Sequence, residues 1–417
     1  MKRLLCLLFA SLMLCGCAAS PTPLPAASDP SPAPNAEPET PSNPPAALPV
    51  VNGYADFCDI LSAALIDGTK NRNLSPVSVY LALAMVTEGA EGATKAELLA
   101  LLGCASIEEL RGVCGAMLES LSVEEEDSSL ILADSLWVRE NAPTREAFCK
   151  SFSDLYRSEV NTVRFGTKET AAQIADWIRV QTHEKITLSP EATDFDPNTV
   201  AVLINTIYLK DAWRDEFYEG ATQPGPFYGP TESTVSYMHR YDDDTYIVRG
   251  EGFLRYSLPL LRVGRMTFVL PDEETPLATL LGTPEQLHTL LYSGESINAH
   301  VDVRIPKFRF EDQLDLGDTL EALGLRTAFD PMQSDFTGIS EAGAVLSKVL
   351  QGSYIGVDEK GVEAAAFTLI ASVEGMAMPA ELPEIDFHLT RPFLFCIESY
   401  DGTVLFLGTV TAPTAAN

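Results

Sequence analysis

The side chains that most often perform catalysis or bind metals occur singly in this sequence. No G-x-S-x-G elbow, H-E-x-x-H pair, phosphate-binding glycine loop or G-x-G-x-x-G turn is present. No local motif therefore places a nucleophile, a metal or a cofactor. We expect no catalytic residue, no metal site, no cofactor and no enzymatic activity. The histidines, which stand in unrelated contexts, are His183, His239, His288, His300 and His388.

Cysteine usage argues against a disulfide scaffold. Of the eight cysteines, Cys6, Cys15 and Cys17 fall within the first 17 residues. The others are odd in number and lack the close pairs found in zinc sites and small disulfide-rich domains. We predict that they are buried free thiols that pack as small apolar side chains. They are Cys58, Cys104, Cys114, Cys149 and Cys396.

One long segment, Asp358 to Glu384, fits no single secondary structure. Its first half alternates like a strand, its alanines suit a helix, and its second half is typical of an exposed loop. If the segment forms a strand, alternate side chains share a face, and one of the two faces carries only uncharged side chains that are small or β-branched. That face would fit a packed sheet. A segment that suits both a loop and a central strand is a candidate two-state element. That face comprises Val362, Ala364, Ala366, Thr368, Ile370 and Ser372.

Asn205 interrupts a strongly apolar run, LINTIYLKDAW. An asparagine in such a strand is either an edge or turn residue or a buried amide in a polar network. The run itself leaves both interpretations open.

The overall charge is strongly negative. Of the 417 residues, 46% are hydrophobic, and 59 acidic residues against 28 basic ones give a formal net charge of -31. Nucleic acids and anionic membranes attract clustered Lys and Arg, so neither is an expected partner. Proteins and small molecules remain as partners.

The first 17 residues predict export. Lys2 and Arg3 precede an apolar run that is too short to span a bilayer and ends in Leu-Cys-Gly-Cys at Cys17. This ending resembles a bacterial lipobox, in which the cysteine is diacylated; the alternative is an ordinary signal peptide. Residues 18–50, rich in Pro, Ala, Ser and acids, predict a disordered tether. We expect a protein that is lipid-anchored at the bacterial cell surface or released.

Residues 51–414 predict one α+β domain. Apolar residues recur at helical spacing in residues 55–68 and 75–103. Later segments are β-branched and aromatic runs flanked by turn residues. Helices first and many strands later, with no linker between them, favour large mixed sheets in a single domain. The strand-like runs are SLILADSLWV, VAVLINTIYLK, RMTFVLP, HVDVRIPKFRF, LFCIES and TVLFLGTV.

Several separated motifs resemble the serpin family over about residues 52–413. Their order and spacing are those of the family. The resemblance implies the serpin fold, with three β-sheets, eight or nine helices and an exposed reactive-centre loop at about residues 359–385. The motifs are NRNLSPVSVYLALAMVTEGAEGATKAELLALL, NTIYLKDAW, VRIPKFRF, DFTGIS, VDEKGVEAAAF, FHLTRPFLFCI and VLFLGTV.

The resemblance also implies a function. In a serpin, a target serine protease cleaves the loop and stays attached as a covalent acyl-enzyme while the loop inserts as a strand into the central sheet. Insertion must be faster than hydrolysis of the acyl-enzyme bond, and it distorts the active site of the protease. The expected partner is a protease, and the inhibitor is expected to be a monomer that meets the membrane only through its lipid. The alternative is a non-inhibitory surface binding protein of the same fold.

Three serpin regions match individual residues. Lys307 matches the lysine that pairs with Glu359, and Trp213 matches the breach tryptophan near the top of the central sheet. Gln351 stands where the family often has a histidine, so histidine-based pH sensitivity is in doubt. The hinge comprises Glu359, Gly361, Val362, Ala364, Ala365 and Ala366. The shutter, a polar latch beneath the sheet, comprises Ser75, Ser78, Asn205 and Gln351.

Counting from Glu359 by the usual serpin spacing places the cleaved bond between Gly375 and Met376. The bond between Met376 and Ala377 is the alternative. Residues 361–389 contain no Arg or Lys, which argues against trypsin-like targets, whose pockets carry an acid. We expect an elastase-like target first and a subtilisin-like or chymotrypsin-like one second, with cysteine proteases as a further alternative.

Overall fold

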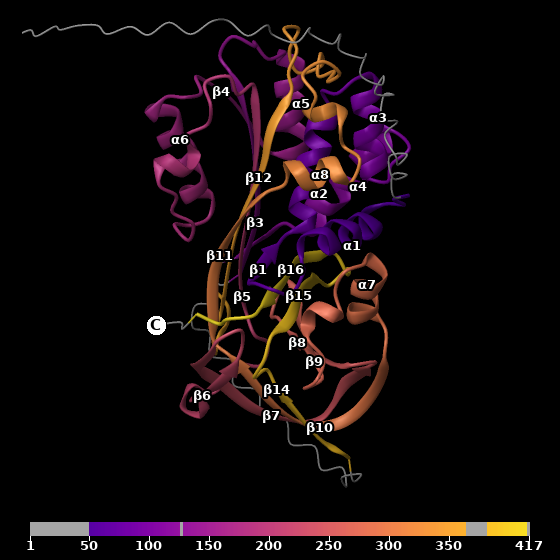
Figure 1. Cartoon of the computed structure of the whole chain (residues 1–417), viewed down its shortest axis with the longest axis vertical. Helices are drawn as coiled ribbons and strands as arrows, with labels where there is room; N and C mark the ends of the chain where they lie inside the picture. The colour runs from indigo at the N-terminus through magenta and orange to yellow at the C-terminus, as the bar shows by residue number, and fades with distance from the viewer. Residues whose placement is uncertain (1–49, 126–127, 364–381, 415–417) are drawn as a thin grey trace, which may run out of the picture. The chain divides into compact units, whose positions relative to one another are not determined.

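The computed structural model describes residues 50–125, 128–363 and 382–414, which all belong to the unit Leu48–Asn417. The predicted signal segment and nearly all of the predicted tether lie outside the described residues. Eight α-helices and two hydrogen-bonded sheets make up the described chain (Figure 1). Among these helices, none combines the length and the apolar character needed to cross a bilayer.

Four helices begin at a Ser or Thr whose side chain accepts a hydrogen bond from the backbone N–H three residues later. These caps are Ser75, Ser106, Thr167 and Thr283. The α-helices are α1 (Tyr54–Leu65), α2 (Pro76–Thr87), α3 (Gly92–Leu101), α4 (Ile107–Ser120), α5 (Glu146–Tyr156), α6 (Lys168–Gln181), α7 (Pro284–Tyr292) and α8 (Gly317–Ala322). Short 3₁₀ turns span Pro190–Thr193, Glu219–Ala221, Leu277–Thr279 and Thr327–Phe329.

The seven-stranded sheet positions the candidate site. Its strands, in spatial order, are β11 (Phe308–Asp315), β12 (Leu346–Val357), β13 (Gly361–Val362), β5 (Ala201–Ala212), β3 (Ser129–Arg139) and β2 (Val123–Glu124), with β4 (Glu159–Val163) paired to β3. Figure 1 shows α6 on one face of this sheet and α2 and α8 on the opposite face. Every residue of α2 is buried, because it contacts β5 of this sheet and β16 (Val404–Val410) of the other.

The nine-stranded sheet holds the C-terminal strands. Its main path is β1 (Arg72–Leu74), β16, β15 (Phe393–Ser399), β9 (Gly264–Pro271), β8 (Phe253–Pro259), β7 (Glu232–Gly250), β10 (Glu295–Pro306) and β14 (Glu384–His388), with β6 (Gln223–Tyr228) paired to β7. Three sheets were expected. The described strands form two networks because β7, which is 19 residues long, pairs with β8 near one end and with β6 near the other.

The five cysteines of residues 50–414 are free thiols, as expected. Four of them are buried and Cys149 is half-buried. Burial raises the pKa of the Cys58 and Cys114 thiols well above their ordinary value. These side chains therefore act as small apolar groups of the core.

Candidate functional site

The candidate site begins where β12 and β5 separate. These two strands run parallel and pair directly from Leu346 to Ser353 on β12. Beyond that point β13 lies between them and runs antiparallel to both: Val362 pairs with Val357 on β12 and with Asp211 on β5. Gly361 and Val362 of the predicted hinge therefore already belong to the sheet. We call the contact between β12 and β5 the β5–β12 boundary.

Gly361 and Val362 fit this position closely. The Val362 side chain is 2% exposed. A Cβ added to Gly361 would lie 2.2 Å from the Asp211 carbonyl oxygen and 2.7 Å from Ala212 Cα. Only glycine fits position 361, because the obstructing atoms belong to the backbone of the neighbouring strand.

The turn that leads into β13 is fixed by Trp213 and Lys307. The Trp213 backbone N–H donates to the Lys360 carbonyl at 2.8 Å, and its indole Nε1–H donates to the Asp358 carbonyl at 2.9 Å. Lys307 Nζ lies 2.8 Å from Glu359 Oε2. The structure thus brings together the breach residues and the hinge glutamate that the resemblance pairs.

Glu359 is held as a carboxylate. Burial raises its pKa, but hydrogen bonds from Lys307 and Thr222 outweigh burial and leave the pKa below its ordinary value. Thr222 Oγ1 donates to Glu359 Oε1 at 2.7 Å. Both carboxylate oxygens therefore have a donor, which suits a buried charge at the start of the hinge.

Glu363, directly after β13, makes a second set of contacts that hold the hinge. Its backbone has a φ of 54° and its N–H donates to the Gly356 carbonyl at 2.9 Å. Its carboxylate forms an ion pair with Lys185, whose Nζ also lies 5.8 Å from the centre of the Tyr354 ring. Lys185 follows α6, so this contact ties the hinge to the segment that crosses the outer face of the sheet. The sequence shows the charge of Glu363 but gives no signal for its partner.

A polar row crosses the inner face of the sheet below β13. Asn205 on β5 lies opposite Gln351 on β12 and opposite Asp134 on β3. Gln351 Nε2 donates to Asn205 Oδ1 at 2.8 Å, and Asn205 Nδ2 donates to Asp134 Oδ1 at 2.6 Å. Asn205 is 1% exposed, so it is a buried amide and not an edge residue.

The N-terminus of α2 completes this row. The Ser75 N–H donates to Gln351 Oε1 at 2.9 Å, and Gln351 Nε2 donates to the Ser75 carbonyl at 2.9 Å. Asn205 Nδ2 also donates to the Ser78 carbonyl at 3.0 Å. The four predicted shutter residues therefore form one hydrogen-bonded cluster beneath the β5–β12 boundary.

Asp134 belongs to this cluster, although it was not among the predicted residues. Burial raises its pKa to about 7, and the hydrogen bond from Asn205 opposes that rise. The available signal was an acidic residue within the apolar run SLILADSLWV. What the run does not show is that Asp134 lies beside Asn205.

The remaining predicted residues lie outside the described residues. They are the later hinge residues, the residues around the proposed bond and the predicted lipidation site: Ala364, Ala365, Ala366, Gly375, Met376, Ala377 and Cys17.

Comparison with known proteins identifies the class. The serpin family model, described as serine protease inhibitor, matches residues 52–413. An uncharacterized serpin-like protein of Thermococcus kodakarensis is 30% identical over 381 residues, covering 88% of this chain and 86% of its own. This chain belongs to the serpin family. Serpins generally inhibit target proteases and are not enzymes.

Solved structures agree with the fold. Tengpin, a thermophilic serpin in the native state, has a TM-score of 0.74 at 27% identity, with 87% of this chain and 93% of tengpin covered. Human thyroxine-binding globulin in complex with thyroxine has a TM-score of 0.74 at 26% identity, with 87% of this chain and 97% of that protein covered. The described part of the chain has the serpin fold.

Proposed function

We propose that this serpin is a suicide inhibitor of serine proteases, in which the chain beyond Val362 inserts along the β5–β12 boundary after cleavage. The observation that carries the proposal is the position of β13 between β12 and β5, antiparallel to both. A strand that continues β13 would meet backbone hydrogen-bonding groups on both sides. It would thereby replace one parallel pairing with two antiparallel pairings, which are slightly more stable per residue.

The register of β13 predicts where each inserted residue would lie. Continued along both neighbours, it brings Thr368 opposite Asn205 and Gln351. The same register brings Ser372 opposite Ala201, the first residue of β5. Insertion from Gly361 to Ser372 would therefore fill the boundary over about 40 Å, at roughly 3.3 Å per residue.

Side-chain chemistry supports this insertion. Val362 is buried, so residues with its parity would face the core. The inward set, from Val362 to Ser372, contains no charge, and insertion would bury no unpaired ion. Thr368 would enter the polar row and offer a hydroxyl to the amides that insertion separates.

We infer an elastase-like target from the small and apolar residues around the proposed bond, Gly375, Met376 and Ala377. Shallow apolar pockets accept such side chains, whereas a pocket with a buried acid selects Arg or Lys. Subtilisin-like and chymotrypsin-like proteases are the second choice, followed by cysteine proteases.

Incubation with pancreatic elastase tests the inhibition mechanism. We expect a covalent complex that survives denaturing electrophoresis and a released C-terminal peptide that begins at Met376 by mass spectrometry. Cleavage without a covalent complex would make the protein a substrate and support the non-inhibitory alternative. A peptide that begins between Val362 and Ile370 would contradict the assigned bond.

We further infer that the protein is exported and held at the bacterial surface as a monomer by lipid on Cys17. The inference is supported by the lipobox-like ending at Cys17 and by the Pro-rich residues 18–50. Growth with an alkyne-tagged fatty acid should label the protein, and Cys17→Ala should abolish the label. Retained label in that variant would contradict lipidation at Cys17.

A further inference from the structure

Three of the five histidines lie on one face of the nine-stranded sheet, where the strands β7, β10 and β14 run side by side. They are His239 on β7, His300 on β10 and His388 on β14. β14 pairs with β10 in parallel, which places Asp302 opposite Asp386 and Arg304 opposite His388. On the other side of β10, His239 of β7 lies opposite Arg304. Strands distant in sequence thus assemble a cluster of imidazole and carboxylate groups.

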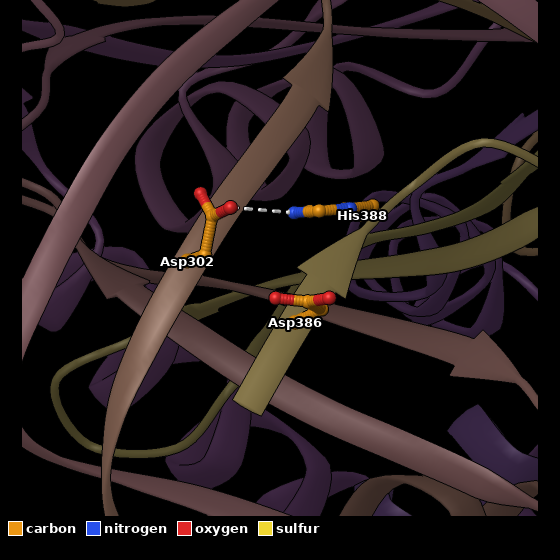
Figure 2. A group of neighbouring side chains, drawn as sticks. All are labelled: Asp302, Asp386 and His388. Atoms are coloured by element: carbon orange, nitrogen blue, oxygen red, sulfur yellow. Dashed lines mark hydrogen bonds and ion pairs between the residues drawn. The ribbon is translucent and has the colours of Figure 1, made fainter. Parts of the chain in front are cut away.

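Asp302 lies at the centre of this cluster. His388 Nε2 lies 3.0 Å from Asp302 Oδ2, and His239 Nε2 lies 2.6 Å from Asp302 Oδ1. Asp302, Asp386 and His388 each offer one ligand atom, and these atoms all lie within 4.8 Å of one another. Figure 2 shows the three side chains, with His388 directed at Asp302 and Asp386 beside them on the same strand as His388.

The charge on this face favours a cation. Like charges directly opposite each other on neighbouring strands are destabilising, and Asp302 and Asp386 form such a pair. Two further acids lie close by: Asp243 pairs with His300 at 3.0 Å, and Glu384 lies opposite His300. Arg304, 3.2 Å from Asp302 Oδ2, offsets part of this negative charge.

We propose that Asp302, Asp386 and His388 bind a Zn²⁺ ion that fastens β14 to β10. One imidazole and two carboxylates form a nitrogen and oxygen ligand set that suits zinc, whereas Mg²⁺ and Ca²⁺ prefer oxygen alone. Asp386 is exposed, so a water molecule can complete a tetrahedral site.

The geometry requires only local adjustment. Zinc bonds of about 2.1 Å place tetrahedral ligand atoms about 3.4 Å apart. The 3.0 Å between His388 Nε2 and Asp302 Oδ2 must therefore widen slightly, and the separations from Asp386, which are at most 4.8 Å, must shorten by about 1.4 Å or less. The exposed Asp386 side chain can rotate to do this. His239 keeps its hydrogen bond to the other oxygen of Asp302 and orients that ligand, as partners outside the coordination sphere do in protein metal sites. The Arg304 side chain, 46% exposed, can turn toward solvent.

Zinc binding would act on an edge strand. Along the main path of the sheet β14 is the last strand, and β10 is its paired neighbour. A metal bridge between Asp302 and the two ligands on β14 would cross-link that pair. It would stabilise the strand that starts just after residues 364–381, without touching the β5–β12 boundary.

Calorimetric titration of the chelator-treated protein with ZnCl₂ tests the proposal. We expect one saturable site per chain, at least tenfold weaker in Asp386→Asn and in His388→Gln. His288→Gln is the matched control, because His288 pairs with Asp59 outside the cluster, and it should leave the affinity unchanged. Arg304→Gln should strengthen binding several-fold, and MgCl₂ should not bind.

Hydrogen exchange of residues 384–388 supplies an independent readout. We expect slower exchange with ZnCl₂ in the parent protein and no change in Asp386→Asn, whose exposed position leaves the fold intact. Absence of a saturable site would overturn the proposal. So would affinity that persists in both ligand variants and disappears on thiol alkylation, because the cysteines would then hold the metal.

Discussion

Gln351 Nε2 donates a 2.8 Å hydrogen bond to Asn205 Oδ1 across the β5–β12 boundary. A strand inserted between β12 and β5 must break this bond, since it moves the two strands apart by about 4.8 Å. The bond is therefore one of the contacts that hold the native state against insertion.

Replacing Gln351 should weaken the native state. Gln351→Leu leaves the Ser75 N–H, the Ser75 carbonyl and Asn205 Oδ1 without this partner, so we expect a loss of about 1–3 kcal/mol. Urea unfolding followed by circular dichroism measures it. Gln313→Leu, at an exposed position, is the matched control, and an equally small change in both variants would contradict the assigned role.

Asp134 should make stability depend on pH. Its pKa rises from 3.8 to about 7 on burial, so the folded state holds this proton more tightly than the unfolded chain. Its contribution to stability is present below about pH 4 and is lost as pH rises toward 7. Asp134→Asn should therefore stabilise the protein at pH 8 by a few kcal/mol, and much less at pH 4.

The measurement is the difference in unfolding midpoint between Asp134→Asn and the parent protein at both pH values. The exposed Asp154→Asn serves as the control for removing one charge. An Asp134→Asn effect of equal size at pH 4 and pH 8 would show that the carboxyl does not titrate as assigned.

Gly361→Ala should expel β13 from the sheet. The new Cβ meets the backbone of Asp211 and Ala212, and such overpacking typically costs about 1–3 kcal/mol. We expect faster hydrogen exchange in residues 358–363. Gly112→Ala, in α4 with no atom near its Cβ, should be neutral or slightly stabilising; the same exchange pattern in both variants would refute the close fit.

The ion pair between Lys185 and Glu363 should hold the hinge. Lys185→Ala leaves a largely buried carboxylate without its cation, so β13 should loosen and exchange several-fold faster. The double variant Lys185→Ala with Glu363→Gln should regain most of the protection, because no charge remains unpaired. Lys150→Ala, whose ion pair is exposed, is the control. Unchanged exchange in Lys185→Ala would show that this ion pair does not hold β13 in the sheet.

Inserted residues of opposite parity should differ in their tolerance of charge. Ala364→Arg places a charge on the face that Val362 shares and would bury it unpaired on insertion, so we expect cleavage without a covalent complex. Ala365→Arg places the same side chain on the outer face and should retain the complex. The ratio of complex to cleaved inhibitor on a denaturing gel measures the difference, and a persistent complex in Ala364→Arg would contradict insertion of this face into the core.

Local patterns predicted the strands well because period and residue type determine them. The apolar run around Asn205 became β5, and Val362, the first residue of the predicted uncharged face, is buried. The role of Asn205 needed the serpin resemblance, since a lone polar residue in a strand does not show its partners. The same resemblance pointed to Lys307 and Glu359, which the structure places 2.8 Å apart.

Contacts between distant segments were beyond the reach of sequence patterns. His239 and His388 meet at Asp302 only because β7, β10 and β14 pair in one register. Nothing in their local sequence sets that register, so these histidines seemed unrelated. The ion pair between Lys185 and Glu363 likewise joins segments that are far apart in the sequence, so no local pattern indicates it. The number of sheets also depended on long-range pairing, because β7 pairs with β6, β8 and β10 and joins them in one sheet.

The surroundings of the β5–β12 boundary also give the protein a built-in optical probe. Its three tryptophans all lie at the seven-stranded sheet: Trp137 on β3, Trp177 on α6 and Trp213 directly after β5. Trp213 donates to the Lys360 and Asp358 carbonyls at the turn into β13. Intrinsic fluorescence excited at the indole band therefore follows the state of the sheet in real time, without a label.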